Sequence, residues 1–213
     1  MYLGRIVSVG MTQDGKATAM YRVSSRSFPN REAREIGESI AIMPRPGFED
    51  DLKKSPYITY NCARVTEKYA IVSNGSQTDP ITEKIAMGMP VRDALAYCSL
   101  SMDYEKDDYN TPRVTAVVSR TEAKGWLAIV RHDALIVEEF DLVPGRLFYV
   151  STYEHNCPSA HHQMDAEFDA ADVDAAAQYV VDGGIFADFE HPVTSAALFV
   201  DGDTVTKATN IVG

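Results

Sequence analysis

Apolar segments of strand length stand at both ends of this chain, and segments with helical spacing lie between them. At the start, residues 2–9 and 17–23 flank an Asp-Gly turn signal at 14–15, which predicts a hairpin. The pattern recurs at the end, at residues 196–200 and 205–208. Hairpins at both ends with helices between them fit an α+β domain of two packed antiparallel sheets covered by helices.

The middle of the chain contains another hairpin pattern and two helical patterns. Residues 58–65 and 69–72 are the strands, and we expect this hairpin to close on Asn74-Gly75. Asp79 is the expected N-cap of the next helix, with Pro80 as its first residue. The remaining predicted elements are strands at 40–43 and 114–118, a helix at 91–102, a meander at 126–130, 134–137 and 147–151, and a helix at 171–181 ended by Gly183-Gly184.

The length and composition favour one globular domain spanning residues 1–213. With 213 residues, 45% of them hydrophobic, the chain can bury a large core and needs neither a disulfide nor a structural metal to fold. No apolar run approaches the roughly 20 residues that a membrane span requires. The three widely spaced cysteines are expected to be reduced thiols. With no signal-peptide pattern at the start, we expect a soluble, cytoplasmic protein.

The charge is unevenly distributed. A net charge of −11 argues against a general nucleic-acid binder, which normally carries excess Lys and Arg. Residues 161–190 contain eight acidic residues and no Lys or Arg, whereas residues 1–31 contain five basic residues against Asp14 alone. The basic stretch either serves a small anion or lies scattered on an exposed face, and composition leaves both interpretations open.

Several polar stretches at expected loops or strand ends are candidates for chemistry, at residues 21–31, 57–64, 73–79 and 102–108. The first combines three arginines with serines, groups suited to phosphate or a carboxamide oxygen. The third precedes a helix, where backbone N–H groups favour an anion. Taken alone, residues 21–31, 73–79 and 102–108 are better explained by a solvated turn, a helix cap and an exposed helix end, and cross-strand pairing explains residues 57–64 just as well.

The sequence predicts no metal and no cofactor. His155, Cys157, His161 and His162 are types that zinc accepts, but their spacing fits no common structural site. We assign no function to this cluster or to the surrounding residues 156–170. No nucleophile elbow and no cofactor fingerprint occurs either.

An ordered series of short strings resembles the archaeal-type IMP cyclohydrolases over nearly the whole chain. The strings are Met-Tyr-Leu-Gly-Arg at 1–5, Tyr-Arg-Val-Ser-Ser-Arg-Ser-Phe-Pro-Asn-Arg at 21–31, Tyr-Asn-Cys at 60–62, Val-Ser-Asn-Gly-Ser at 72–76, Met-Asp-Tyr-Glu-Lys-Asp at 102–107, Asn-Thr-Pro-Arg at 110–113, Ser-Thr-Tyr-Glu at 151–154 and His-Pro-Val-Thr at 191–194. Any one string is weak evidence, whereas the series in this order is specific.

The resemblance implies a four-layer αββα sandwich like that of the N-terminal-nucleophile hydrolases. This chain begins Met1-Tyr2, so it lacks the Ser, Thr or Cys that those hydrolases expose. The implied reaction closes the purine ring: 5-formamidoimidazole-4-carboxamide ribonucleotide loses water to give IMP, the final step of de novo purine biosynthesis. The implied partner is therefore a small purine nucleotide, and the oligomeric state is left open.

The resemblance also implies roles for particular residues. Glu105 would be the general base and Arg31 the fixed cation. The residues expected to bind substrate are Arg22, Arg26, Asn74, Gly75 and Ser76 for the phosphate, and Tyr60, Asn61, Asn110, Thr111 and Arg113 for the base and ribose.

Two other functions fit parts of this pattern. One is an amidohydrolase of the same fold that cuts a C–N bond, against which the missing N-terminal nucleophile argues. The other is a non-catalytic purine-nucleotide-binding module, which would use the basic loops and have no need of Glu105.

Overall fold

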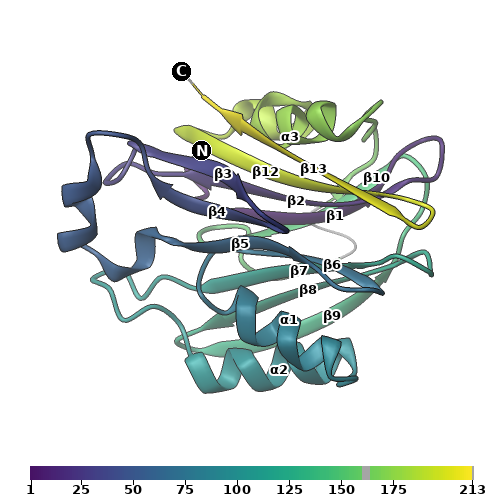
Figure 1. Ribbon diagram of the computed structural model, residues 1–213, viewed down its shortest axis with the longest axis horizontal. Coiled ribbons are helices and arrows are strands. Elements are labelled where there is room, and N and C mark those ends of the chain that lie inside the picture. Colours follow the sequence, from purple (N-terminus) through teal and green to yellow (C-terminus); the bar gives the residue numbers. More distant parts are fainter. Residues whose placement is uncertain (160–163, 213) are drawn as a thin grey trace.

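A computed structural model describes residues 1–159 and 164–212, in which two antiparallel sheets are stacked face to face (Figure 1). The first sheet has the strand order β11-β10-β1-β2-β12-β13, with β1 (Ile6–Met11), β2 (Ala17–Ser24), β10 (Arg146–Ser151), β11 (Met164–Asp165), β12 (Pro192–Asp201) and β13 (Thr204–Ile211). The second has the order β3-β4-β5-β6-β7-β8-β9, with β3 (Arg31–Ile36), β4 (Ser39–Pro44), β5 (Tyr60–Val65), β6 (Tyr69–Ser73), β7 (Arg113–Ser119), β8 (Lys124–Arg131) and β9 (Ala134–Asp141).

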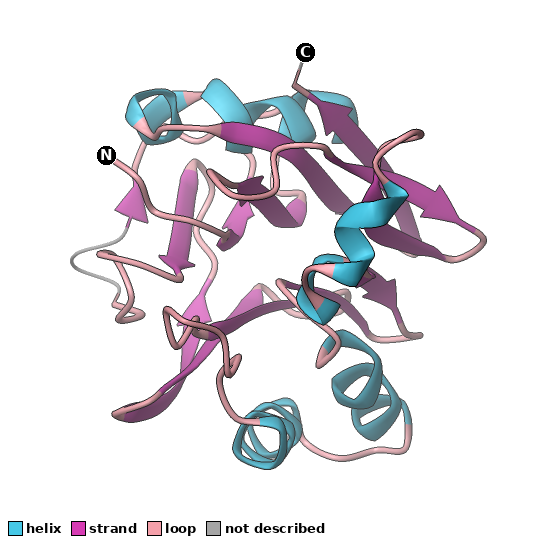
Figure 2. Ribbon diagram, turned by 90° about the vertical axis from the view of Figure 1, so that its left-hand side faces the viewer, coloured by secondary structure: helices cyan, strands magenta, loops and turns pink. Residues whose placement is uncertain are grey.

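Helices cover the outer faces of the two sheets (Figures 1 and 2). Helix α3 (Val173–Asp182) packs on β12 and β13 of the first sheet. Helices α1 (Thr78–Ala86) and α2 (Val91–Met102) pack on the second sheet, α1 against β5 and β6 and α2 against β8 and β9. Short 3-10 helices are η1 (Glu49–Lys53), η2 (Pro56–Ile58) and η3 (Gly184–Asp188). The α+β class with two antiparallel sheets is therefore confirmed. No helix in the described ranges is long and apolar enough to cross a membrane.

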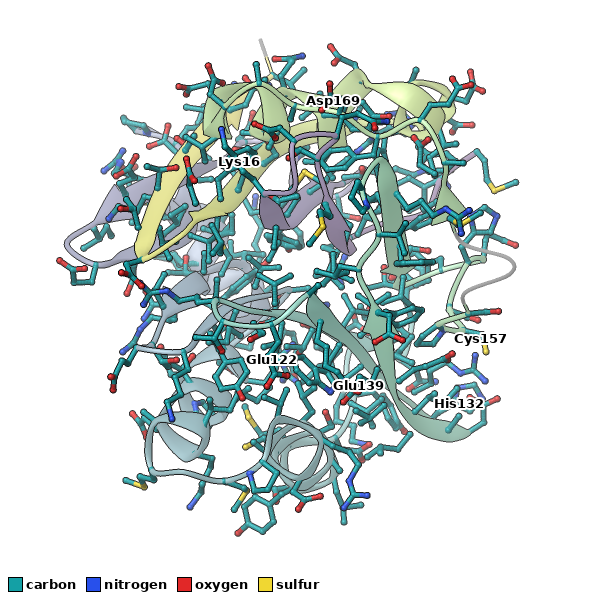
Figure 3. All side chains as sticks on the ribbon, turned by 90° about the vertical axis from the view of Figure 1, so that its right-hand side faces the viewer. Lys16, Glu122, His132, Glu139, Cys157 and Asp169 are labelled. Atoms are coloured by element: carbon teal, nitrogen blue, oxygen red, sulfur yellow. The ribbon has the colours of Figure 1, made fainter. Side chains whose placement is uncertain are left out.

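The central strands are buried on both faces. In β2, Ala19, Tyr21 and Val23 belong to the cluster between the sheets, whereas Met20 packs beneath α3 with Phe186. Successive side chains of a strand point to opposite faces, so a strand covered on both sides buries every residue. All eight residues of β2 are buried for this reason. Figure 3 shows side chains filling the space between the layers.

The hairpins predicted at the two ends of the chain are confirmed, as β1–β2 and β12–β13. The hairpin of β5 and β6 also forms, but its turn lies at Thr66–Lys68, where the Thr66 N–H donates to the Tyr69 carbonyl at 2.8 Å. The prediction that it closes on Asn74-Gly75 is wrong, because Asn74 lies beyond β6 and binds the strand β7 through the Val114 N–H at 2.8 Å.

Two other predictions need correction. Asp79 is not the N-cap of α1; Gln77 holds that position, and the Asp79 carboxylate instead accepts hydrogen bonds from Asn61 and Arg64. The expected meander is split, because β8 and β9 pair in the second sheet while β10 crosses to the first and pairs with β1. Strand β3 was not predicted. Its outer end, Arg34 to Ile36, is exposed at a sheet edge, so it lacks an apolar pattern.

Candidate active site

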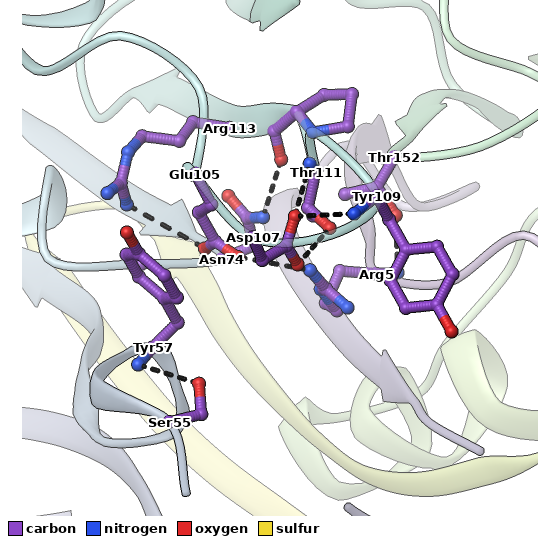
Figure 4. A network of polar contacts seen from close by, with 12 residues as sticks. Arg5, Ser55, Tyr57, Asn74, Glu105, Asp107, Tyr109, Thr111, Arg113 and Thr152 are labelled. Atoms are coloured by element: carbon purple, nitrogen blue, oxygen red, sulfur yellow. Dashed lines mark hydrogen bonds and ion pairs between the residues drawn. The ribbon is translucent and has the colours of Figure 1, made fainter. Parts of the chain in front are cut away.

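A cavity of about 490 Å³ opens between the N-terminal segment, the loop before β3 and the loop after α2. Its volume lies in the range of small-molecule sites. The lining residues are Met1, Tyr2, Arg5, Ser25, Arg26, Ser27, Phe28, Arg31, Ser55, Tyr57, Ile58, Glu105, Asp107, Tyr109, Tyr153 and Glu154. Figure 4 shows the polar network that runs along one side of this cavity.

The N-terminal segment places Arg5 in the cavity. Gly4 has a φ of +73°, and a Cβ there would lie 2.7 Å from the Tyr153 ring, so the backbone needs glycine at this point. Next to it, the Arg5 N–H donates to Thr152 Oγ1 at 3.1 Å, and the Thr152 N–H donates to the Arg5 carbonyl at 2.9 Å. Arg5 is thereby fixed with its Nη2 3.4 Å from Glu105 Oε2.

Glu105 lies in a loop that is tied at both ends. The loop leaves α2 at Asp103, which has a φ of +56°, and Asn110 near its end has a φ of +48°. Such backbone angles are uncommon for residues other than glycine and are frequent at functional sites. The Glu105 N–H donates to the Thr111 carbonyl at 2.8 Å, and the Asp107 carboxylate accepts from the Thr111 N–H and hydroxyl at 2.8 and 2.7 Å.

The Glu105 carboxylate is buried between two guanidinium groups (Figure 4). Arg5 approaches one oxygen, and Arg113 Nη1 lies 3.7 Å from the other. Burial raises the pKa of Glu105 above its ordinary value, Arg5, Arg113 and Arg31 oppose that rise, and Asp107 adds to it. Glu105 is thus a carboxylate whose pKa is raised by burial although three arginine side chains oppose the rise.

Arg31 is the first residue of β3 and is 3% exposed. Its Nε donates to the Phe28 carbonyl at 3.1 Å, while among the described residues its two terminal nitrogens donate to no protein acceptor. Behind it, the hydroxyls of Tyr21 and Tyr60 share a hydrogen bond of 2.6 Å. Burial raises the pKa of both tyrosines although Arg5 and Arg31 oppose the rise, so both are neutral. Arg31 therefore presents two unused donors to the cavity that it lines.

The outer rim of the cavity is aromatic and cationic. The Arg26 guanidinium lies 4.1 Å from the centre of the Tyr2 ring, which is stacked on Tyr153 at 6.0 Å. Arg26 is also 3.6 Å from a Glu190 carboxylate oxygen, and its side chain is 59% exposed. This rim offers a partly exposed positive charge at the mouth of the site.

The structure brings together only part of the predicted set. Glu105, Arg31 and Arg26 line the cavity. Arg22 lies outside the cavity lining: its guanidinium is buried beneath α3 and donates to backbone carbonyls between residues 181 and 190. An arginine with every donor used in this way has none left for a phosphate.

The other predicted ligands surround the cavity without lining it. Tyr60 is held behind Arg31, and Asn61 is bound to Asp79. Asn74, Gly75 and Arg113 lie behind Glu105, Ser76 is exposed, and Asn110 and Thr111 belong to the loop that carries Glu105. Of these residues, Arg113 and Thr111 contact the lining side chains of Glu105 and Asp107.

Sequence reasoning missed Arg5, Tyr57, Asp107 and Tyr153. Arg5, Asp107 and Tyr153 lie inside strings that carry the family resemblance, and that was the available signal. Tyr57 was part of a polar stretch that reads as a strand, whereas it lies in η2.

The His/Cys cluster shows no metal-site geometry in the residues that the structure describes. In those ranges no three His, Cys, Asp or Glu side chains lie close enough to share an ion. His155 Nδ1 is bound to the Tyr149 hydroxyl at 2.6 Å, and Cys157 is exposed. His161 and His162 lie outside the described residues.

Comparisons with known proteins agree on one family. A family model described as IMP cyclohydrolase-like protein matches residues 2–204. The IMP cyclohydrolase of Methanosphaera stadtmanae is 48% identical over 199 residues, which are 93% of this chain and 94% of that protein. Those of Methanocella arvoryzae and Methanocaldococcus jannaschii are 47% and 41% identical, over 93% and 98% of this chain and 92% and 98% of theirs.

Proposed function

This chain belongs to the IMP cyclohydrolase-like family, and from that premise we propose that its cavity closes 5-formamidoimidazole-4-carboxamide ribonucleotide to IMP. The observation that carries the proposal is the meeting of Glu105, Arg31 and Arg5, which come from three distant parts of the chain, in one cavity. A buried carboxylate beside fixed cations is the pairing that this cyclisation needs, because protons must move from nitrogen to oxygen and one oxygen gains charge.

Cyclisation joins two groups of one molecule. The carboxamide nitrogen attacks the formyl carbon, a hydroxyl-bearing ring intermediate forms, and water leaves. Because the substrate already holds both groups, the enzyme must mainly fix the rotamer that brings them into contact. We infer that the ring packs beside Tyr57 and Tyr153, whose side chains line the cavity.

Glu105 is the proposed base. An amide nitrogen is a poor nucleophile, and removal of its proton during attack strengthens it. Glu105 returns that proton to the oxygen on the attacked carbon, which forms the hydroxyl of the ring intermediate and restores the carboxylate. Water leaves when the C–O bond breaks, a C=N bond forms, and the proton of the former formamido nitrogen passes through Glu105 to the departing oxygen. Only the ionised form accepts a proton, and its pKa is raised by burial. We therefore expect kcat to fall as pH is lowered through that raised pKa.

Arg31 is the proposed stabiliser of the oxygen on the attacked carbon. That oxygen gains negative charge as the new C–N bond forms, and fixed donors aimed at it lower the barrier. Arg31 has two unused terminal nitrogens beside the cavity, and its Nε anchors it to the Phe28 carbonyl. Arg5 lies on the other side of Glu105 and is the second cation within reach.

The 5′-phosphate is assigned to the rim formed by Ser25, Arg26 and Ser27. A guanidinium binds phosphate with two parallel hydrogen bonds, and hydroxyls supply further donors. The Arg26 side chain is 59% exposed, so an anion entering the cavity can reach its guanidinium.

We further infer that the layered arrangement is that of the N-terminal-nucleophile hydrolases, and that residues 1–213 act as one catalytic domain. The reverse of the proposed reaction hydrolyses a cyclic amidine, so the enzyme class would be that of hydrolases acting on C–N bonds in cyclic amidines. The chemistry requires no covalent intermediate and hence no exposed nucleophile.

The test is to incubate the protein with the formamido ribonucleotide and separate the products. IMP formation at a rate proportional to protein supports the proposal. Release of formate together with the amino ribonucleotide would identify an amidohydrolase instead. Tight binding with neither product would identify a nucleotide-binding module. Glu122→Gln is the matched control for Glu105→Gln. Glu122 is exposed and lies outside the cavity lining (Figure 3), so this variant should keep full activity.

A further inference from the structure

Arg113 contacts Glu105 from the start of β7, and its guanidinium lies 5.8 Å from the centre of the Tyr57 ring. It is the first residue of β7 and is 7% exposed, yet it is absent from the cavity lining. Its Nε donates to the Asp103 carbonyl at 2.9 Å and its Nη1 to Gln77 Oε1 at 3.0 Å. Two anchors thus hold the guanidinium against Glu105 Oε1, 3.7 Å away.

Gln77 is itself held in place. Its amide nitrogen donates to Asn74 Oδ1 at 2.9 Å, and that oxygen also accepts from the Val114 N–H at 2.8 Å. Asn74 Nδ2 donates to the Pro112 carbonyl at 2.9 Å. The start of β7 and the segment before α1 are therefore locked together, and Gln77 presents its oxygen to Arg113.

Gly75 leaves the space that this arrangement needs. A Cβ at this position would lie 2.5 Å from Arg113 Nη1, 2.6 Å from Gln77 Oε1 and 3.5 Å from Glu105 Oε1. The glycine does not have a positive φ, so its backbone conformation is open to any residue. The constraint is therefore steric, and the groups that a Cβ would meet are the Arg113 guanidinium and the Gln77 amide oxygen that anchors it.

We propose that Arg113 is a positioning residue that keeps the Glu105 carboxylate ionised and oriented toward the substrate. Gln77 anchors Arg113, and the lack of a side chain at Gly75 leaves room for the guanidinium. This inference rests on the proposed function, because it concerns the base of that reaction. It reassigns Arg113, Asn74 and Gly75, which the sequence suggested as substrate ligands, to the support of Glu105.

The two guanidinium groups beside Glu105 have different tasks in this arrangement. Arg5 lines the cavity, whereas Arg113 does not line it and is held by the Asp103 carbonyl and Gln77. The charged groups acting on Glu105 are Arg5 from the N-terminal segment, Arg31 from β3, Arg113 from β7 and Asp107 from its own loop. Loss of Arg113 removes one of three cations while the burial of the carboxylate remains.

The experiment measures kcat and KM against pH for the wild type, Arg113→Gln and Gly75→Ala. A cation within about 4–6 Å lowers a carboxyl pKa by roughly 1–3 units, so the acid limb of kcat in Arg113→Gln should move up by about 1 pH unit. Most of the wild-type kcat should return at high pH, with KM little changed. Gly75→Ala pushes Arg113 away without changing charge and should shift the limb the same way. The exposed Arg92→Gln is the control, with the limb unmoved.

A second measurement does not depend on activity. An infrared titration of each protein, from which the spectrum of its Glu105→Gln form is subtracted, reports the protonation of Glu105 directly. Its midpoint should rise in Arg113→Gln and in Gly75→Ala. If either variant melts below the assay temperature, the other still tests the proposal.

A raised KM with an unmoved acid limb would overturn the inference and make Arg113 a substrate ligand. An equal loss of kcat at every pH with an unmoved infrared midpoint would reduce it to a structural residue. Failure of the wild type to form IMP would instead contradict the proposed function. The infrared titration would then still decide whether Arg113 lowers the pKa of Glu105.

Discussion

Replacing Arg22 by methionine tests the placement of an arginine whose sequence context suggested a phosphate ligand. The guanidinium is fully buried beneath α3, where Nε donates to Ser24 Oγ at 2.9 Å. Nη1 donates to the carbonyls of Val181 and Phe186 at 2.8 and 3.0 Å, and Nη2 to two further carbonyls at residues 189 and 190. One side chain thus ties the end of α3 and the following segment to β2.

The magnitude follows from what methionine leaves behind. Methionine matches the arginine side chain only as far as Nε and has no donor, so four backbone carbonyls lose a partner. An orphaned buried acceptor costs about 1–3 kcal/mol. Some of this is offset because a buried charge is removed: burial lowers the pKa of Arg22 to about 10, against a smaller opposing effect of Asp182. Since the four losses are coupled, we expect a net loss of about 3–5 kcal/mol in the free energy of unfolding.

The assay is urea unfolding together with steady-state kinetics well below the melting temperature. Arg22→Met should unfold at a markedly lower urea concentration, with KM for the nucleotide close to that of the wild type. The exposed Arg92→Met is the control and should change stability by less than about 0.5 kcal/mol. A large rise in KM with unchanged stability would contradict this structural role and would indicate that Arg22 binds the phosphate.

Three other outcomes are expected. Tyr21→Phe removes the 2.6 Å hydrogen bond to Tyr60 and should cost about 1 kcal/mol by urea unfolding; an unchanged midpoint would mean that this pair adds nothing. Arg31→Ala should lower kcat by about 10²–10³ and Arg31→Lys by less in the same kinetic assay, whereas equal losses would show that charge is irrelevant there. Activity should survive prolonged dialysis against EDTA because base and cation are both side chains; loss that zinc restores would point to the His/Cys cluster.

The elements that the sequence predicted well are those set by neighbouring residues. The hairpin at each end combines apolar strands with a Gly-containing turn, and α2 carries buried positions at helical spacing. What it missed depends on distant contacts. Strand β10 pairs with β1, more than 130 residues away, and the chain between β9 and β10 gives no sign of the change of sheet. Asp79 has the residue type of a helix cap, but its partner Arg64 lies on β5.

The residues of the candidate site also differ in how far the sequence alone could predict their positions. Glu105 and Arg31 were predicted through the family strings, and the fold brings both to one cavity. The sequence does not show whether an arginine faces a cavity or donates to the protein's own carbonyls. Arg22, which is buried, and Arg26, which lines the cavity, therefore could not be distinguished before the fold was known. Gly75 is another example, because a glycine beside a helix start suggests an anion site, while the structure shows a guanidinium occupying the space where its side chain would be.

The most direct test of the central claim is single-turnover IMP formation by Glu105→Gln at neutral pH, with nucleotide binding measured on the same preparation. Glutamine keeps the size of the side chain but cannot take up a proton. We predict that IMP formation collapses while the affinity for the nucleotide largely persists. IMP formation at near the wild-type rate would contradict it, and Glu105 would then be only a buried carboxylate that balances Arg5 and Arg113.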